Sequence, residues 1–197
     1  MFNLITLETD KVKLTPLTQD HLTGLLEAGS HPDIWRWVFN NYCKDSATLT
    51  TWFEQTAQFD SKNQLVMAII CKQTNNVVGT TRLFRLDEQN MSVEIGHTFI
   101  AKSAQKTHIN THSKYLLLNY AFEQLKLVRV TFCTHENNLI SRNAIARLGA
   151  RFEGLAYKQR KLVDGSYRNT AIFSITDDLW PTVRDNLLQK AEQTELA

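Results

Sequence analysis

The sequence predicts a mixed α/β protein of the α+β type, in which helices cover a largely antiparallel sheet. Two observations carry this prediction. The expected elements follow one another as a strand, helices, three antiparallel strands, a helix, a strand, a helix and a terminal hairpin. This order lacks the regular alternation of strand and helix found in a dinucleotide-binding fold, and no GxGxxG motif occurs.

The composition is that of one ordinary globular domain. The chain has 197 residues, of which 43% are hydrophobic and 21% are charged, and neither a linker nor an internal repeat divides it. We therefore expect a single domain over residues 1–197, with a polar segment after about Leu188 that frays. The net charge of +2 is too small to indicate a nucleic acid or a membrane surface as a partner.

The three cysteines, Cys43, Cys71 and Cys133, are far apart and form no CxxC pair. This spacing predicts buried thiols in a reducing compartment and argues against zinc. The first residues do not read as a signal peptide, and no apolar stretch approaches 18 residues. We therefore expect a cytoplasmic protein with no membrane partner.

The first elements are a strand and three helical segments. Residues 11–17 alternate between polar and apolar and predict a strand, after which Thr18 is expected to cap a helix over 19–28. Residues 32–39 and 46–59 are predicted to be helical. Six aromatic side chains in and around these two segments are expected to be buried or to line a pocket: Trp35, Trp37, Phe39, Trp52, Phe53 and Phe59.

Three strands are predicted next. Residues 65–72 and 76–86 are expected to form a hairpin with its turn near Thr74 and Asn75, because polar turn residues separate two apolar runs. Residues 91–100 form the third strand.

Residues 110–125 predict the clearest helix, capped by Asn110 or Thr111. Its apolar stripe consists of Leu118, Ala121, Phe122 and Leu125. The β-branched segment 127–134 that follows predicts a strand.

The remaining elements are a helix, a hairpin and a last helix. Residues 139–148 are predicted to be helical, with Gly149 ending the helix. Asp164-Gly165 is a strong hairpin turn, and the second strand of that hairpin covers roughly 167–175. The last helix is expected to start near Pro181.

The segment 101–114 joins a predicted strand to the clearest helix and is rich in basic side chains, namely Lys102, Lys106, His108, His112 and Lys114. The N-terminus of a helix offers unpaired N–H groups and a partial positive charge, which suit a phosphate. The alternative is a solvated loop before an ordinary capped helix. The four-residue spacing of His108 and His112 suits a metal, but His108 is expected to precede the helix and no third ligand lies nearby.

This segment also resembles a known family. From Gln105 it reads QKTHINTHSK, which matches the first position of the Q/R-x-x-G-x-G/A segment of GNAT acetyltransferases. His108 and Asn110 replace the two glycines. With VEIG upstream, the stretch resembles the RimL-like variant Q-R-T-x-V-N-T-E-A-K, which also lacks the glycines and from which His112 and Ser113 depart.

The resemblance continues toward the C-terminus. Residues 135–145 and 148–150 read HENNLISRNAI and LGA, similar to the family element N-x-x-S-x-x-A-I-x-x-L-G-A. In all, the similarity covers roughly residues 8–185. It implies a GNAT fold of the RimJ/RimL-like branch, acetyl-CoA as the co-substrate with no metal, and a homodimer.

The resemblance also implies where acetyl-CoA binds. The strands at 91–100 and 127–134 would be parallel neighbours that splay apart and admit the pantetheine arm. A backbone N–H near Phe99 or Ile100 would face the acetyl oxygen, and the N–H groups of residues 106–111 would hold the pyrophosphate. The expected acetyl-CoA contacts are Phe99, Ile100, Gln105, Lys106, Thr107, His108, Ile109, Asn110, Thr111, Asn138 and Ser141.

Two residues at the start of the helix over 139–148 have roles by resemblance. Asn138 would hydrogen-bond the pantetheine, and Ser141 would protonate the thiolate that leaves. The alternative is structural, with Asn138 as the N-cap and Ser141 in the first turn.

Glu94 is the expected general base, acting directly or through water, because the RimL-like pattern has a glutamate at this position. The alternative is outward exposure, since Val93 and Ile95 would face the other side of the strand. Three weaker candidates are His97, His135 and Tyr157.

The acceptor is expected to be a primary amine, either a protein N-terminus or a small molecule. An α-amino group has a pKa of about 8 and a lysine of about 10.4, so a site with no obvious strong base favours α-amines or weakly basic small amines. Specificity is expected to lie in residues 32–60 and 157–168. One alternative is a weak or inactive CoA-binding sensor, suggested by the lost glycines. Another is a binding module unrelated to CoA, although the mild charge argues against nucleic acid.

Overall fold

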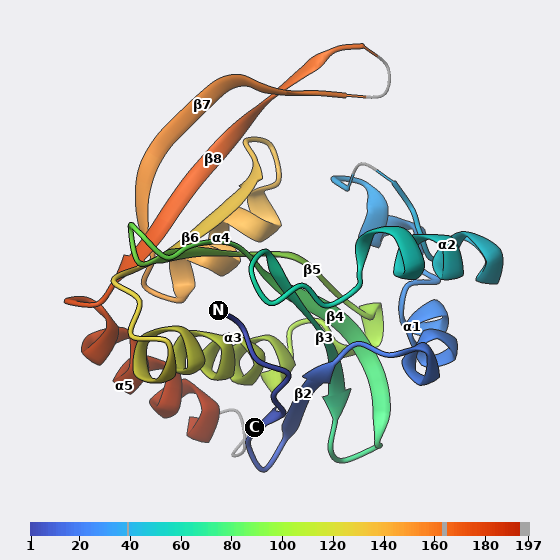
Figure 1. The fold of residues 1–197 in the computed structure, drawn as a ribbon, viewed down its shortest axis with the longest axis horizontal. Coiled ribbons are helices and arrows are strands. Elements are labelled where there is room, and N and C mark those ends of the chain that lie inside the picture. Colours follow the sequence, from blue (N-terminus) through green and yellow to red (C-terminus); the bar gives the residue numbers. More distant parts are fainter. Residues whose placement is uncertain (39, 163–164, 194–197) are drawn as a thin grey trace.

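A computed structural model describes the whole chain except residues 39, 163–164 and 194–197. Within the described residues, eight strands form a sheet in the order β1-β2-β3-β4-β5-β6-β8-β7 (Figure 1). The strands are β1 (Leu7–Glu8), β2 (Val12–Pro16), β3 (Gln64–Cys71), β4 (Asn76–Asp87), β5 (Ser92–Ile100), β6 (Arg129–His135), β7 (Arg151–Lys161) and β8 (Tyr167–Thr176). Neighbouring strands are antiparallel except β5 and β6, which are parallel. The predicted fold class is confirmed.

The helices lie on both faces of the sheet. The α-helices in the described ranges are α1 (Leu22–Ala28), α2 (Ser46–Thr56), α3 (His108–Asn119), α4 (Leu139–Arg147) and α5 (Trp180–Gln193). Shorter turns are η1 (Gln19–His21), η2 (Pro32–Trp35), η3 (Lys102–Ala104) and the π-helical η4 (Tyr120–Gln124). None of the helices in the described part of the chain is both long and apolar enough to cross a membrane.

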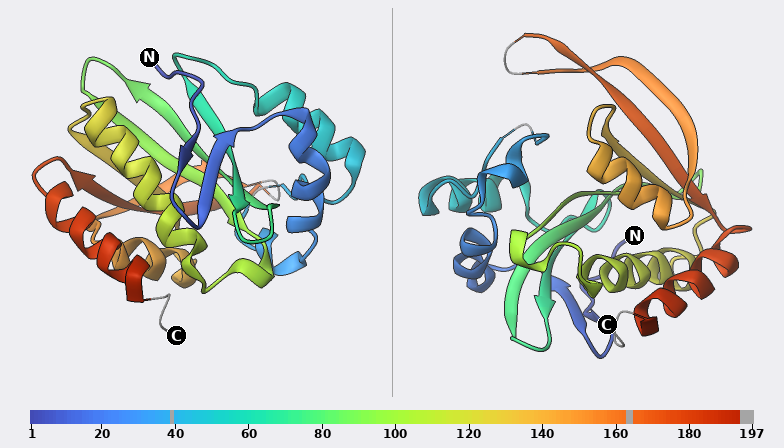
Figure 2. Two further views of the ribbon diagram at one scale, coloured as in Figure 1. Left: turned by 90° about the horizontal axis from the view of Figure 1, so that it is seen from below. Right: turned by 180° about the vertical axis from the view of Figure 1, so that it is seen from behind.

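The alternation of side chains along β3 divides the interior into two cores. Leu65, Met67 and Ile69 point into a core shared with α3, α4 and α5. Val66 and Ala68, between them in the sequence, point into a second core under α1 and α2. Because helices cover both of its faces, this central strand is an almost unbroken apolar run. Figure 2 shows α3 and α5 side by side on one face and the α1–α2 pair on the other.

The β7–β8 hairpin extends beyond the rest of the sheet and curves over the face that carries α1 and α2 (Figures 1 and 2). The predicted turn at Asp164-Gly165 falls partly outside the described residues, because residue 164 is not among them. Gly165 has a φ of +84°, which suits a tight turn. The hairpin therefore stands opposite the α1–α2 pair with the centre of the sheet between them.

Two helix boundaries differ from the predictions. In the described part of the predicted segment 32–39, only Pro32–Trp35 form a 3₁₀ turn, and the Trp35 Nε1 donates to the carbonyl of Gly29 at 2.8 Å. The helix predicted over 110–125 begins earlier, because Thr107 and not Asn110 or Thr111 is its N-cap. The Thr107 hydroxyl accepts from the Ile109 N–H at 3.3 Å.

The ends of this and the last helix also differ from the predictions. Past Asn119 the chain forms a π-helical turn, with the Leu125 N–H donating to the Tyr120 carbonyl five residues back. The last helix runs from Trp180 to Gln193, whereas only its start near Pro181 was predicted. The short strand β1 was not predicted, because two residues are too few to show a periodicity.

Lys114 is buried between α3 and the sheet, with 6% of its surface exposed. Its Nζ donates to the hydroxyls of Thr98 at 2.8 Å and Thr81 at 3.3 Å. Desolvation lowers the pKa of this amine to about 7.

Replacing this lysine by methionine is expected to change how stability depends on pH. Between pH 7 and 10, Lys114 of the wild type is protonated in the unfolded state but not in the folded state. The free energy of unfolding of the wild type therefore rises with pH in this range. The free energy of unfolding of the wild type minus that of Lys114→Met should therefore increase by about 1.4 kcal/mol per pH unit. Urea denaturation at several pH values measures it, with Lys62→Met on an exposed lysine as the control. A pH-independent difference between wild type and Lys114→Met would contradict the prediction.

Candidate active site

The parallel strands β5 and β6 separate part of the way along their length. They pair at three positions, ending with Glu94 opposite Thr131. β5 nevertheless continues to Ile100 and remains paired with β4, and β6 continues to His135 and remains paired with β8. The inner edges of the two strands therefore carry backbone groups that the sheet does not use. This is the splayed parallel pair that the resemblance predicted.

A bulge in β5 accompanies this separation. Between the pairs Arg82–Gly96 and Thr80–Phe99, β5 contains one residue more than β4, and His97 has a φ of +48°. An extra residue bends a strand and increases its twist. Gly79 allows β4 to follow the bend, because a Cβ at this position would lie 2.1 Å from the Phe99 carbonyl oxygen.

The backbone of Ile100 points into the gap between the strands. The next residue, Ala101, donates its N–H to the Val78 carbonyl at 2.8 Å, on the β4 side. Because successive residues of a strand direct their backbone groups to opposite sides, the N–H of Ile100 points away from β4 and that of Phe99 points toward it. Of the two predicted residues, only Ile100 therefore offers its N–H to the gap, while the Phe99 side chain packs in the second core.

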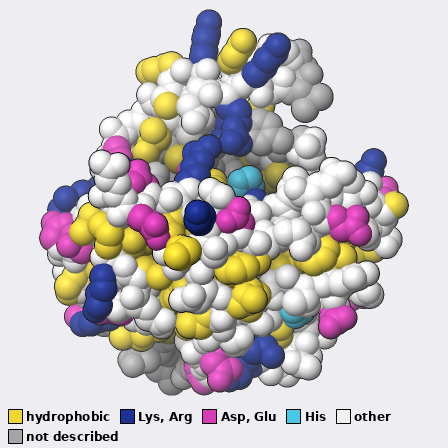
Figure 3. Space-filling model, in the orientation of Figure 1, with side chains coloured by type: hydrophobic (Ala, Val, Ile, Leu, Met, Phe, Trp, Pro, Cys, Tyr) yellow, Lys and Arg dark blue, Asp and Glu magenta, His cyan; other side chains and the backbone are white. Residues whose placement is uncertain are grey.

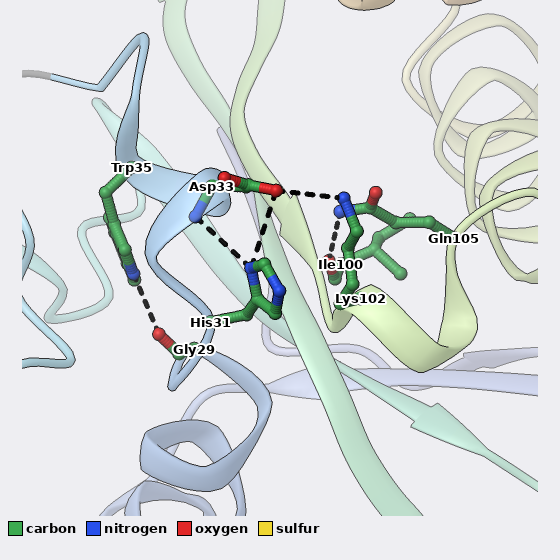
Figure 4. Close-up of polar contacts among 7 residues, drawn as sticks. All are labelled: Gly29, His31, Asp33, Trp35, Ile100, Lys102 and Gln105. Atoms are coloured by element: carbon green, nitrogen blue, oxygen red, sulfur yellow. Dashed lines mark hydrogen bonds and ion pairs between the residues drawn. The ribbon is translucent and has the colours of Figure 1, made fainter.

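Gln105 lies on the same side of β5. Its Nε2 donates to the Ile100 carbonyl at 3.0 Å, as Figure 4 shows, and its own N–H donates to the Ala101 carbonyl. Figure 4 also shows Lys102 reaching Asp33 of η2, with 3.3 Å between Nζ and the carboxylate. The loop after β5 is thus held both to its own strand and to the N-terminal segment.

The start of α3 presents a set of backbone N–H groups. Lys106 is exposed and has a φ of +62°, and Thr107 then caps the helix through the Ile109 N–H. The helix cannot pair the N–H groups of His108 and Asn110 internally, since both residues are in its first turn.

The two positions where the family pattern has glycine have ordinary helical conformations. His108 and Asn110 both belong to α3, so neither needs the conformational freedom of glycine. The prediction that His108 precedes the helix was wrong, because the cap is Thr107. The His108 ring contacts the His112 ring edge-on, with 5.6 Å between their centroids, and Thr111 occupies the same first turn.

Asn138 and Ser141 lie where β6 leads into α4. The Asn138 Oδ1 accepts from the Ser141 N–H at 3.1 Å, which confirms Asn138 as the N-cap. Both side chains are half-buried. Because α4 follows directly after the splayed end of β6, this cap is placed at the β6 edge of the gap.

Glu94 occupies the last paired position before the strands separate. It is 9% exposed, so the alternative of outward exposure was wrong. Its Oε2 accepts from the Arg85 Nη1 at 2.9 Å. Cys133 of β6 lies beside it, and burial, with a smaller contribution from this carboxylate, raises the pKa of the Cys133 thiol to about 12.

Four arginines act electrostatically on His97, and the sequence did not single them out. Burial, and then the charges of Arg82, Arg160, Arg85 and Arg168, lower the pKa of His97 to about 4. The signal available was the direct pairing of Arg160 with Arg168 across the predicted hairpin. Figure 3 shows a hollow beneath the hairpin, with basic side chains and a histidine along it.

The aromatic residues of the N-terminal segment form the wall opposite the hairpin. Tyr42 stacks on Trp52 with 4.0 Å between ring centroids, and the Trp35 ring lies 5.2 Å from that of Phe99. The Trp37 ring lies 4.9 Å from the His135 ring at the end of β6, so the segment reaches across the splayed pair.

The other predictions for these side chains have mixed outcomes. Phe59 is partly exposed, because it follows the end of α2, and Phe39 lies outside the described residues. Tyr157, a weaker catalytic candidate, is exposed on the hairpin. Within the described part of the chain, no three His, Cys, Asp or Glu side chains gather as metal ligands.

Comparisons with known proteins bear on this architecture. Residues 11–151 match the family described as "Acetyltransferase (GNAT) domain". The chain is 33% identical over 105 residues to the Bacillus subtilis (strain 168) protein named "Putative ribosomal N-acetyltransferase YdaF", covering 53% of this chain and 56% of that protein. It is 24% identical over 122 residues to the "Probable N-acetyltransferase YjcK" of the same organism, covering 62% and 67%. The matched region thus spans just over half the length of the first of these relatives.

Solved structures show the same architecture. A GCN5-related N-acetyltransferase from Brucella melitensis superposes with a TM-score of 0.90 at 28% identity, covering 96% of this chain and 86% of that one. Mycobacterium smegmatis RimJ, solved in complex with CoA-disulfide, shares the fold with a TM-score of 0.73 at 19% identity, covering 91% and 88%. These findings confirm the predicted resemblance to GNAT acetyltransferases, and the fold shared with RimJ agrees with the predicted branch. The chain therefore belongs to the GNAT acetyltransferase family.

Proposed function

We propose that this protein is an N-acetyltransferase that moves the acetyl group of acetyl-CoA to a primary amine of its acceptor. The observation that carries the proposal is the splayed β5–β6 pair, with the Ile100 N–H directed into the gap and the start of α3 after the same end of β5. An extended arm that ends in a thioester fits between two strands with unused backbone groups.

In this proposal the start of α3 binds the diphosphate of CoA. Within residues 106–111, the backbone N–H groups that neither the helix nor its cap uses favour an anion, as does the partial positive charge of the helix end. The exposed Lys106 adds a full charge. Gln105 holds the loop before the helix in place, because its side chain donates a hydrogen bond to the Ile100 carbonyl. The helical conformations of His108 and Asn110 support binding despite the missing glycines.

The pantetheine arm and its thioester occupy the gap. The Ile100 N–H donates to the thioester oxygen and stabilises the negative charge that develops there when the amine attacks. Phe99 contributes packing and not its N–H. The Asn138 Oδ1 is used by the helix cap, which leaves its Nδ2 to donate to an amide carbonyl of pantetheine.

Two side chains handle protons. Ser141, in the first turn of α4 at the β6 edge, gives a proton to the departing thiolate. Glu94 takes the proton of the amine, directly or through a water molecule, and its hydrogen bond from Arg85 holds the carboxylate in place. Holding the amine and the thioester together supplies much of the rate.

The acceptor in this proposal is a protein α-amine. The name of YdaF as a ribosomal N-acetyltransferase supports a protein substrate. An α-amine is also easier to deprotonate than a lysine side chain. A Glu94 that is already engaged with Arg85 suits an amine of the lower pKa.

Acetylation rates are expected to favour α-amines. A peptide with a free N-terminus and no lysine should be acetylated at least tenfold faster near pH 7.5 than an N-blocked peptide with one lysine, since about a quarter of α-amines are uncharged there. Release of CoA thiol and mass spectrometry of the peptide measure this. Faster lysine acetylation would reject the α-amine, and CoA binding with no transfer to any amine would instead favour the sensor.

Ser141→Ala is expected to lower kcat by roughly 10²–10⁴-fold, because the thiolate loses its proton donor. The KM for acetyl-CoA should change little, since the Asn138 cap uses the backbone of residue 141. Ser46→Ala, on an exposed serine of α2, is the matched control. Wild-type kcat in Ser141→Ala would show that another group or water protonates the thiolate.

A further inference from the structure

On the face of the sheet that carries α1 and α2, the side chains below the β7–β8 hairpin carry more positive than negative charge. Leu83, Val93 and Ile95 point into the core with α3 and α5. By alternation, Arg82 and Glu94 point to the opposite face, where the Arg85 side chain meets the Glu94 carboxylate.

The same argument places the hairpin arginines on this face. Ala171, Phe173 and Ile175 of β8 belong to the core with α3 and α5, so Arg168 points the other way. Arg160 is directly opposite Arg168 in the β7–β8 pair, and opposed residues point to the same side.

The described carboxylates on this face are already paired with other arginines. Glu94 is engaged with Arg85, and Glu153, further along the hairpin, is engaged with Arg129 and Ser174. Four arginines influence the neighbouring His97, against the single Glu94 among them.

Arg82 is the arginine on this face whose charge is least compensated by described side chains. It is 8% exposed, and its Nη1 donates to the neutral Gln64 side chain at 2.8 Å. Its Nε is buried with no hydrogen-bond partner, and among the described residues no carboxylate pairs with this guanidinium. A buried charge without a counter-charge is costly, so an anion from outside would be strongly favoured at this place.

CoA does not account for this surface in the proposed arrangement. Its diphosphate is assigned to the start of α3, which follows the C-terminal end of β5. Arg85 meets Glu94 near the other end of β5, and Arg160 and Arg168 lie on the hairpin. The surface lies where the acceptor would approach the thioester, between the hairpin and the N-terminal aromatic wall (Figures 1 and 3).

We infer that Arg82, Arg160 and Arg168 bind an anionic group that the acceptor carries close to its amine, which makes the substrate an acidic amine. This inference rests on the proposed acetyl transfer. The carboxylates of an N-terminal peptide with acidic second and third residues have the required chemistry, and a small amine with a phosphate group shares it.

A pair of matched acceptors tests the inference. The peptide Ser-Asp-Glu-Ala-Ala should show a kcat/KM at least tenfold above that of Ser-Asn-Gln-Ala-Ala, which has the same shape without the charges. A second arm compares phosphoethanolamine with ethanolamine and tells a small anionic amine from a peptide. Preference in either arm supports the inference, and equal rates in both overturn it. If no amine is acetylated in any arm, the proposed transferase function fails instead.

Hairpin variants identify the residues responsible. Arg168→Gln and Arg160→Gln should each reduce the ratio of acidic to neutral kcat/KM by roughly tenfold, and Arg168→Lys should restore part of it. Lys161→Gln removes the same charge from the adjacent position, whose side chain points to the opposite face, and should keep the ratio. Thermal melting of each variant verifies folding. A ratio reduced equally by Lys161→Gln would mean that general surface charge, and not this site, sets the preference.

Discussion

The whole site depends on the point at which β5 and β6 stop pairing. Backbone hydrogen bonding joins them up to Glu94 and Thr131 and then ends, while each strand keeps its outer neighbour. Unused N–H and C=O groups in the middle of a sheet are unfavourable unless something else satisfies them. These unused groups are available to an extended ligand, and a bulge at His97 accompanies the opening.

The two cores give this opening rigid sides. α3 and α5 pack beneath β5 and β6, and α1 and α2 pack above β3 and the end of β5, where Phe99 contacts Trp35. Residues of one strand serve both layers, so β5 cannot shift without disturbing both. This explains how a loop that begins at Ala101 can hold Gln105 and the start of α3 in a constant relation to Ile100.

The charges are arranged by layer. Lys114 is buried in the sheet–α3 layer and has hydroxyl partners, whereas several arginines on the opposite face act on His97. In a low-dielectric environment, an unpaired charge attracts a ligand of opposite charge more strongly than it would in water. In the two proposals, this one face both positions the amine and selects its chemical character.

The sequence alone determined the order of the elements, the fold class and the family. These features depend on periodicity and on motifs such as the caps and turns around Asn138 and Gly149, which are local properties of the chain. It also indicated Gln105 and the start of α3 as an anion site. The exact start of α3 was missed by a few residues, since Thr107, Asn110 and Thr111 are all competent caps and only packing chooses among them.

Only the tertiary structure decided which backbone group faces the gap, that Glu94 is buried against Arg85, and that arginines from β4 and the hairpin share one face. Arg82 and Arg168 are far apart in the sequence, and no local pattern links them. They come to share one face of the sheet because long-range pairing places β8 next to β6. Local propensities and caps thus determined the helices and strands, and the pairing of distant strands determined which side chains form the site.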